Sequence, residues 1–411
     1  MVVSVMRAAV LAFLFCAASL HSADLALTGG TVYGSPNEQP ISNAVIVIHD
    51  GRIADVGTRA SVQIPKDARI VDCSGKFITA GFWNTHVHVF TPVLLHAHDA
   101  ASTDLNKELD AMLNRWGFTT VFDVASILDN TLALRRRIES GEVHGPRILT
   151  VGEPLWTEVP IYVRDYLLAN HINMPVVTTP DQAAARVREL IQKGADGIKL
   201  FTGSVQAGQV ANMPLPLVQA ATDEAHRHSL PVFAHPQNEL GLDAAISGGV
   251  DILAHTAPQS PPWTPEFIAK LKGAHMALIP TLTLFDFEMR KYGASDAGRQ
   301  QLIDKVTSEL SAFSTAGGEV LFGTDVGYTT HFDTTMEFKL MSDAGMNFPQ
   351  ILASLTTTPA QRFQHSGRSG RIAKGMDADI VVLEDDPAKD VTALSKVRLV
   401  IRGGQAQYSL Q

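Results

Sequence analysis

The feature that most constrains the fold of this chain is a series of short apolar runs, several of them closed by a histidine, lysine or aspartate. Runs of this length, separated by longer amphipathic stretches, are typical of buried parallel strands covered by helices. Eight are expected: one that ends at His86, then residues 120–124, 147–151, 197–201, 231–235, 251–255, 277–281 and 320–325. Eight strand and helix units over roughly 280 residues match a (β/α)8 TIM barrel in size.

Two amphipathic stretches show the expected helical spacing most clearly. Residues 180–193 repeat apolar side chains at intervals of three and four, and Gly194 follows as a helix stop. Residues 214–228 form a second stretch of this kind. An open doubly wound sheet is the alternative α/β architecture, but polar residues from strands one, four, five, six and eight converge only if the sheet closes.

The segments on either side of the expected barrel have a different pattern. In residues 24–80, two alternating runs flank the turn Asp50-Gly51, which is a hairpin signature. Residues 366–411 return to the same style and include an apolar run at 397–402. We therefore expect a small β-sandwich built from residues 24–80 and 366–411, around an α/β barrel at residues 81–365.

Polar residues at the ends of the apolar runs are the candidates for chemistry. His86 and His88 form an His-x-His in which both imidazoles share one face of an extended segment. An isolated His-x-His motif, or a single buried histidine, is more often structural than a metal ligand. The set as a whole favours a metal centre, because carboxyl ends of parallel strands carry the chemistry of α/β enzymes. Its members are His86, His88, Lys199, His235, His255 and Asp325.

This ordered set, together with the split sandwich, resembles the metal-dependent amidohydrolase superfamily. The segments 194–199, 249–256, 323–327 and 370–383 are similar to the imidazolonepropionase-like and prolidase-like branch. The resemblance implies one metal held by His86, His88, Lys199 and Asp325, and a second held by Lys199, His235 and His255.

Lys199 is the unusual member of the set, because an ammonium group cannot bind a cation. Desolvation and neighbouring cations favour the neutral amine, which can add carbon dioxide to form a carbamate. That anionic group can bridge two ions about 3.5 to 4 Å apart. Imidazole and carboxylate ligands suit zinc, and also manganese, cobalt or iron. We expect two divalent metal ions, with zinc as the default.

The expected reaction is hydrolysis of an amide, peptide-like or cyclic amide bond by a metal-activated hydroxide, whose parent water has its pKa lowered to about 7. Asp325 would be the catalytic residue, accepting the proton and passing it to the leaving nitrogen. A mononuclear deaminase or cyclic amidine hydrolase is the first alternative; there a His-x-x-Glu is typical, whereas Asn238 stands at that place. A lactone or phosphoester hydrolase and a catalytically silent binding protein are the others.

Candidates for substrate contact are weaker. Thr202 and Gly203 follow Lys199 directly, and Tyr162, Tyr328 and His331 lie in loops or near strand ends. Further aromatic candidates for the wall of a pocket are Trp156, Trp263 and Phe285. No arginine stands obviously placed to bind a substrate carboxylate.

Composition restricts the partners. The formal charge is −9, with 45% hydrophobic residues, so a large core forms and no basic surface for nucleic acid is expected. A small-molecule substrate is the expected partner. A homo-oligomer is possible, and no sequence feature indicates a number of subunits.

The amino terminus predicts export. Arg7 precedes an apolar stretch at residues 8–20 that is too short for a membrane span, which is the shape of a signal peptide. Cleavage after Ala23 would give a periplasmic or secreted protein without stable membrane association and with Cys73 as its one cysteine.

Overall fold

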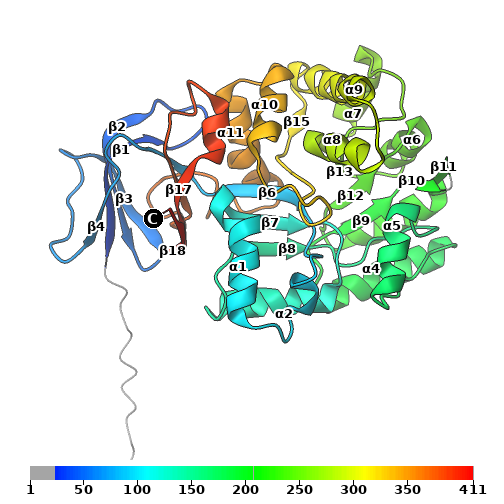
Figure 1. Ribbon diagram of the computed structural model, residues 1–411, viewed down its shortest axis with the longest axis horizontal. Helices are drawn as coiled ribbons and strands as arrows, with labels where there is room; N and C mark the ends of the chain where they lie inside the picture. Colours follow the sequence, from blue (N-terminus) through cyan, green and yellow to red (C-terminus); the bar gives the residue numbers. More distant parts are fainter. Residues whose placement is uncertain (1–23, 207, 411) are drawn as a thin grey trace, which may run out of the picture.

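A computed structural model describes residues 24–206 and 208–410, so the predicted signal peptide 1–23 lies outside the described residues. The chain has an α/β fold in which a β-sheet made from both chain ends lies beside a larger body of strands and helices (Figure 1). No helix in the two described ranges is long and apolar enough to cross a membrane.

Eight parallel strands occupy the larger body, as the apolar runs predict. They form a three-stranded sheet in the order β6-β7-β8 and a five-stranded sheet in the order β15-β14-β13-β12-β9. Their bounds are β6 Phe82–Val87, β7 Phe118–Asp123, β8 Arg147–Thr150, β9 Ile198–Phe201, β12 Val232–His235, β13 Ile252–Ala254, β14 Ala277–Ile279 and β15 Glu319–Val320. The eighth strand is shorter than expected, because ladder pairing with β14 ends at Val320.

The two parallel sheets contact each other at both of their edges. A parallel bridge joins Leu155, after β8, to Leu200 in β9. At the other edge, the amide of Thr85 in β6 donates to the carbonyl of Phe322 at 2.8 Å, and Val87 bridges Val326.

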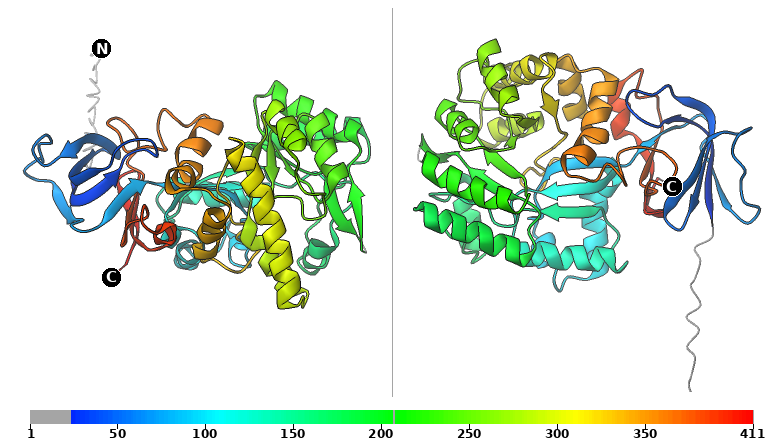
Figure 2. Two further views of the ribbon diagram at one scale, coloured as in Figure 1. Left: turned by 90° about the horizontal axis from the view of Figure 1, so that it is seen from above. Right: turned by 180° about the vertical axis from the view of Figure 1, so that it is seen from behind.

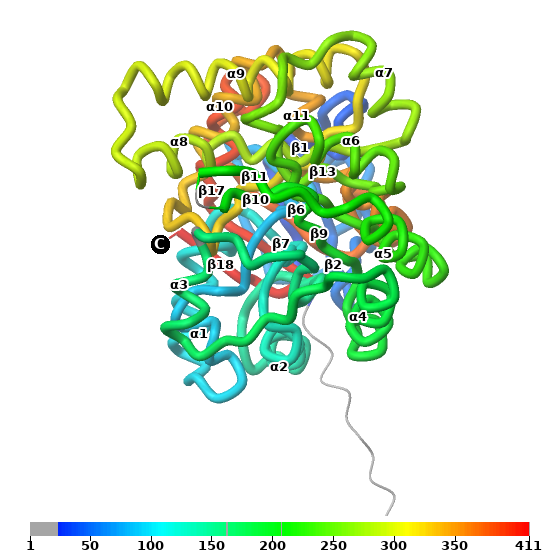
Figure 3. The backbone as a smooth tube through the Cα atoms, turned by 90° about the vertical axis from the view of Figure 1, so that its right-hand side faces the viewer, coloured from blue at the N-terminus to red at the C-terminus, as the bar shows by residue number. Residues whose placement is uncertain are grey.

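Helices alternate with these strands and lie around them, as Figure 3 shows for α2, α4 and α5. The predicted helix at 180–193 is confirmed as α4, in which the Thr179 side chain accepts from the amide of Gln182 and Gly194 ends the helix at a φ of 104°. The helix predicted at 214–228 is confirmed as α5, Leu215–Arg227. The other helices of this body are α1 Ser102–Met112, α2 Leu128–Glu139, α3 Ile161–Ala169, α6 Glu239–Ser247, α7 Pro265–Gly273, α8 Leu282–Lys291, α9 Asp296–Thr315, α10 Thr335–Asp343, α11 Phe348–Leu355 and α12 Thr357–Arg362, with short 3-10 turns at Leu94–His96, Asn114–Trp116 and Val391–Ser395.

The parallel strands are buried on both faces, which explains why their sequences read as continuous apolar runs. Side chains of one face pack against each other in a cluster that includes Phe122, Phe233, Ile252 and Ile279. Those of the other face, such as Val121 and Leu253, pack against the helices.

The flanking sheet has eight strands and unites the two chain ends (Figure 2). Its order is β18-β17-β16-β5-β1-β2-β3, and β4 pairs with β1. The predicted hairpin is confirmed, with positive φ values of 48° and 74° at Asp50 and Gly51. Antiparallel pairing of β5 with β16 joins the two segments. The bounds are β1 Leu25–Tyr33, β2 Ile41–His49, β3 Arg52–Thr58, β4 Arg69–Asp72, β5 Phe77–Ala80, β16 Ile380–Leu383, β17 Val397–Arg402 and β18 Gln405–Ser409.

Two insertions were not expected from the sequence. A hairpin of β10 Gly203–Gln206 and β11 Gln209–Asn212 follows β9, and the long pair α8 and α9 follows β14. Both follow the carboxyl ends of parallel strands, where they shape the cavity described below.

Candidate active site

All six predicted ligands lie at the carboxyl ends of parallel strands and line a single cavity of about 1180 Å³. His86 belongs to β6, Lys199 to β9 and His235 to the end of β12. His88, His255 and Asp325 follow β6, β13 and β15. The convergence expected from the order of the strands is therefore present.

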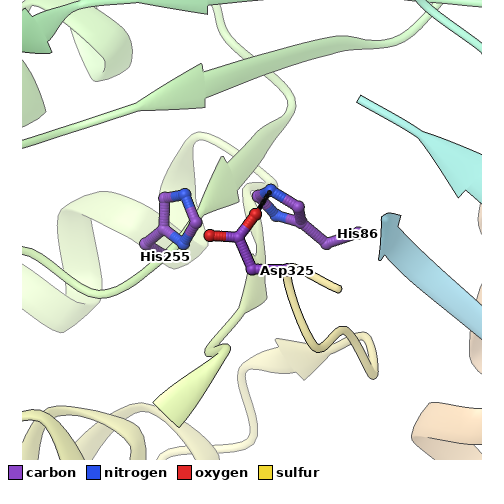
Figure 4. Close-up of side chains that lie close together, drawn as sticks. All are labelled: His86, His255 and Asp325. Atoms are coloured by element: carbon purple, nitrogen blue, oxygen red, sulfur yellow. Dashed lines mark ion pairs between the residues drawn. The ribbon is translucent and has the colours of Figure 1, made fainter. Parts of the chain in front are cut away.

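His86, His255 and Asp325 form the tightest group, with one ligand atom of each within 4.8 Å of the others. Figure 4 shows the Asp325 carboxylate between the two imidazoles, with its ion pair to His86 Nε2 at 3.1 Å. The ring centroids of His86 and His255 lie 4.5 Å apart, and those of His235 and His255 lie 4.8 Å apart.

The orientation of His88 is set by a backbone carbonyl. Its Nδ1 lies 2.8 Å from the carbonyl oxygen of Ala125, which can only accept, so Nδ1 carries the proton. Nε2 then faces Asp325 Oδ1 at 2.6 Å. Burial lowers the pKa of His88, but Asp325, the carbonyl of Ala125 and Asp123 together raise it, and the net direction is upward. A proton or a metal cation between Nε2 and Oδ1 satisfies both atoms.

His255 is oriented by a threonine that the sequence analysis did not single out. Its Nδ1 lies 2.6 Å from Thr281 Oγ1, and the Thr281 hydroxyl donates to the carbonyl of Pro280 at 2.9 Å. Because that hydroxyl has one proton to donate, Nδ1 of His255 is the donor in the first bond. Nε2 therefore keeps its lone pair. The sequence did carry a signal for this residue, because Thr281 is the polar residue that ends the seventh apolar run, 277–281.

Burial sets the protonation of the cluster. It lowers the pKa of His86 and of His235 to about 3 and that of His255 well below its usual value. It also lowers the pKa of Lys199 to about 7. For Asp325, burial raises the pKa, but the neighbouring imidazoles of His86 and His88 lower it further, so the carboxylate is ionised. At neutral pH the imidazoles of His86, His235 and His255 and the carboxylate of Asp325 are therefore electron-pair donors.

These donors fit divalent metal ions. Nδ1 of His86 is buried and has no hydrogen-bond partner among the described residues. Lys199 is 1% exposed, and within the described ranges no acidic side chain forms an ion pair with it. Burying such groups without compensation is costly, whereas a cation bound by their lone pairs removes that cost.

The backbone around the cluster is strained. His255, Thr281 and Asp325 have positive φ values of 112°, 44° and 59°, which cost energy in residues other than glycine and gather at functional sites. A side chain at Gly323 would lie 2.7 Å from Cβ of His86, and one at Gly327 would lie 1.9 Å from the carbonyl oxygen of His88. The Gly-Thr-Asp-Val-Gly segment thus allows the close approach of the eighth strand to the first.

The predicted substrate contacts are placed unevenly. Tyr328 lines the cavity, whereas Thr202 is buried and donates to the carbonyl of His235 at 3.2 Å. Gly203 begins β10, and His331 is exposed beside Phe287. None of Thr202, Gly203 and His331 is among the described lining residues. The side chain of Tyr162 lies outside what the structure describes.

The further aromatic candidates for the wall of the pocket are also placed unevenly. Trp156 and Phe285 line the cavity, while Trp263 packs against Phe313 of α9 and faces a separate hollow. Sequence reasoning missed Glu288 and Lys291 of α8, which also line the cavity. Their spacing of three residues is that of an ordinary surface pair on a helix, so the sequence carried no distinguishing signal.

Comparison with known proteins agrees with this geometry. The chain is 22% identical over 404 residues to an ochratoxinase of Aspergillus niger, covering 88% of this chain and 82% of that protein. A crystal structure of an Xaa-Pro dipeptidase with bound methionine matches 94% of this chain and 100% of its own, with a TM-score of 0.81 and 22% identity. A putative prolidase from Bifidobacterium longum matches at a TM-score of 0.79 and 25% identity, over 93% of this chain and 94% of that one.

The profile of the amidohydrolase family, described as "Amidohydrolase family", matches residues 77–406, which span all eight parallel strands and all six predicted ligands. The predicted resemblance is therefore confirmed, with prolidases among the structural neighbours. This chain belongs to the amidohydrolase family and is a hydrolase that acts on carbon–nitrogen bonds.

Proposed function

We propose that this chain is a two-metal hydrolase of amide bonds in a small-molecule substrate. The observation that carries the proposal is the convergence of six electron-pair donors from five strands on the floor of a single cavity. The lowered pKa values of His86 and His255 and the unpartnered Nδ1 of His86 support a cationic occupant.

The proposal includes the expected architecture. The contacts at both edges of the two parallel sheets support a closed (β/α)8 barrel over residues 81–365. The sheet shared by β1–β5 and β16–β18 supports a domain built from residues 24–80 and 366–411, for which we propose a β-sandwich. We keep the proposal that residues 1–23 are a signal peptide and that the mature protein is periplasmic or secreted.

We keep the two ligand sets that the family resemblance implies, and the convergence of the six side chains on one cavity supports them. His86, His88, Lys199 and Asp325 would hold one ion, and Lys199, His235 and His255 the other, with Lys199 carboxylated and zinc as the proposed metal. When bound, these ions would polarise the substrate carbonyl and lower the pKa of a water molecule to about 7. Neutral Lys199, available because its pKa is about 7, supplies the amine that carbon dioxide modifies.

Asp325 moves the proton in this scheme. Its carboxylate is ionised and 3% exposed, and it lies between His86 and His255, where a water molecule and the substrate carbonyl would meet. The oxygen of water bonds to the carbonyl carbon while Asp325 accepts its proton. Asp325 then gives the proton to the leaving nitrogen as the C–N bond breaks. His88, held by Ala125, and His255, held by Thr281, keep fixed orientations.

Metal analysis of the purified protein, with and without bicarbonate, tests the proposal. We expect about two metals per chain, a sharp fall in Lys199→Ala, and no fall in the surface control Lys193→Ala, whose side chain pairs with Glu189. Asp325→Asn should abolish amide hydrolysis and retain most of the metal. One metal in both the wild type and Lys199→Ala would favour the mononuclear alternative, and stoichiometric metal without turnover of any amide would refute the proposed activity.

A further inference from the structure

The cavity above the six ligands has two apolar walls. The first, here called the α3 wall, consists of Phe90, Trp156, Tyr166, Leu167 and Met174. Within this wall the ring centroids of Phe90 and Tyr166 lie 5.0 Å apart. The ring of Trp156 lies 5.4 Å from that of Phe201, which stacks on His235 at 4.8 Å. The wall therefore begins directly beside a proposed metal ligand.

The second wall, here called the α8–α9 wall, is formed by Leu284, Phe285, Met289 and Leu302. These residues belong to the helix pair inserted after β14, whereas the α3 wall follows β8, apart from Phe90, which follows β6. Because both walls line the cavity that holds the six ligands, apolar surface is available for a group on each side of the scissile bond of a bound substrate. The volume of about 1180 Å³ slightly exceeds the usual range for ligand pockets, about 300 to 1,000 Å³, and leaves room for two such groups.

The charged residues of the lining decide which polar groups the substrate can carry. Outside the six ligands, the cationic side chains in the described lining are Lys291 and Lys305, and no arginine is among them. Lys305 donates to the carbonyls of Pro258 and Ser260 and lies 3.7 Å from Glu309. Its ammonium group is thus occupied by the protein itself.

Lys291 is neutralised in a similar way. Its Nζ lies 3.7 Å from Glu288 Oε1 and donates to Tyr328 Oη at 3.1 Å. The Tyr328 hydroxyl in turn donates to Glu288. Within this group the ammonium charge of Lys291 is balanced by the carboxylate of Glu288, so the described lining side chains outside the proposed metal ligands leave no unbalanced ammonium group for a carboxylate of the substrate.

We propose that the cavity selects uncharged amides with an apolar group on each side of the C–N bond, and that Glu288 excludes substrates with a free carboxylate by neutralising Lys291. This inference rests on the proposed function. In the reaction, water adds its oxygen to the carbonyl carbon, the C–N bond breaks, and the nitrogen leaves as an amine with the proton it receives. The carboxylic acid and the amine are the two products.

A pair of probes with one skeleton tests the charge preference. N-benzoyl-isopentylamine and N-benzoyl-L-leucine differ only by the carboxylate. We expect kcat/KM of the metal-loaded wild type to favour the uncharged amide by about tenfold or more, since a buried charge without a partner is costly. Calorimetric binding of both compounds to Asp325→Asn provides a second measurement that does not depend on turnover.

Variants of α8 identify the origin of the preference. Glu288→Gln leaves the ammonium charge of Lys291 without a balancing carboxylate. The ratio of kcat/KM between the uncharged and the charged probe should then fall by about fivefold, which corresponds to the free energy of a partly exposed ion pair. Adding Lys291→Met should restore the ratio. The control Glu189→Gln removes the partner of Arg186 on α4, outside the cavity, and should leave the ratio unchanged.

The outcomes separate the two proposals. Equal or tighter binding and turnover of N-benzoyl-L-leucine by the wild type, or an unchanged ratio in Glu288→Gln, would overturn the charge selection and leave the amide hydrolase intact. If neither probe nor any other amide is turned over by metal-loaded protein, the proposed function fails, and the binding measurement still decides which probe the cavity prefers.

Discussion

Replacement of Thr281 by valine isolates the contribution of a single hydrogen bond to the proposed metal centre. The side chains have nearly the same shape, but valine cannot accept the Nδ1 proton of His255, which lies 2.6 Å from the hydroxyl oxygen. His255 is 4% exposed, so water cannot readily replace the lost partner. The imidazole is then free to turn or to place its proton on the nitrogen that should face the metal.

The expected magnitude follows from this burial. An unsatisfied buried donor costs about 1 to 3 kcal/mol, which corresponds to a factor of about 5 to 150 in a binding constant. Loss of the partners that orient metal-binding histidines typically costs about 10- to 100-fold in metal affinity or activity. We therefore expect the ion proposed to be held by Lys199, His235 and His255 to bind about 10- to 100-fold less tightly in Thr281→Val.

Competition titration with a chromophoric chelator measures this affinity, and kcat/KM on an amide substrate measures its consequence. Thr281→Ser keeps the hydroxyl and should stay near the wild type in both. Thr222→Val removes a buried hydroxyl in α5 that donates to the carbonyl of Val218 and is not among the described residues that line the cavity, so it should lower stability alone. Unchanged metal affinity in Thr281→Val would refute the orienting role of Thr281.

Three further predictions concern stability and metal content. Gly327→Ala should destabilise the fold by about 1 to 3 kcal/mol or more in urea unfolding, because its Cβ would lie 1.9 Å from the carbonyl oxygen of His88 at a φ of 101°; wild-type stability would contradict the close approach. Burial raises the pKa of Glu337 from 4.5 to about 7, so stability should fall as the pH rises from about 5 to 7.5, by at most about 1.4 kcal/mol per unit, and Glu337→Gln should flatten this slope. Removal of metal with a chelator should abolish activity and lower Tm reversibly, because an ion bound only by the folded state adds about 2.7 kcal/mol at a hundred times its Kd; a Tm that does not respond to re-added zinc would contradict a bound metal.

Much of the strand and helix pattern could be read from the sequence. Strands buried on both faces are apolar throughout, so runs such as the one in β12 can be recognised from the sequence. The end of α4 can be recognised in the same way, because Gly194 ends the helix at a φ of 104°. The turn at Asp50 and Gly51 could also be predicted from its own residues, because few residues other than glycine, asparagine and aspartate tolerate its backbone angles. The ends of the runs then pointed to the six candidate ligands, which the fold brings to one cavity.

The sequence alone determined which residue types stand at the strand ends, since that depends on local pattern and on the order along the chain. Only the tertiary structure decided what surrounds them. Three examples are the contact of Thr281 with His255, the hydrogen bonds that link Glu288, Tyr328 and Lys291, and the burial that lowers the pKa of Lys199 to about 7. Each involves residues from different loops and helices. Such contacts depend on how separate elements pack, and no periodicity within a single segment records that packing.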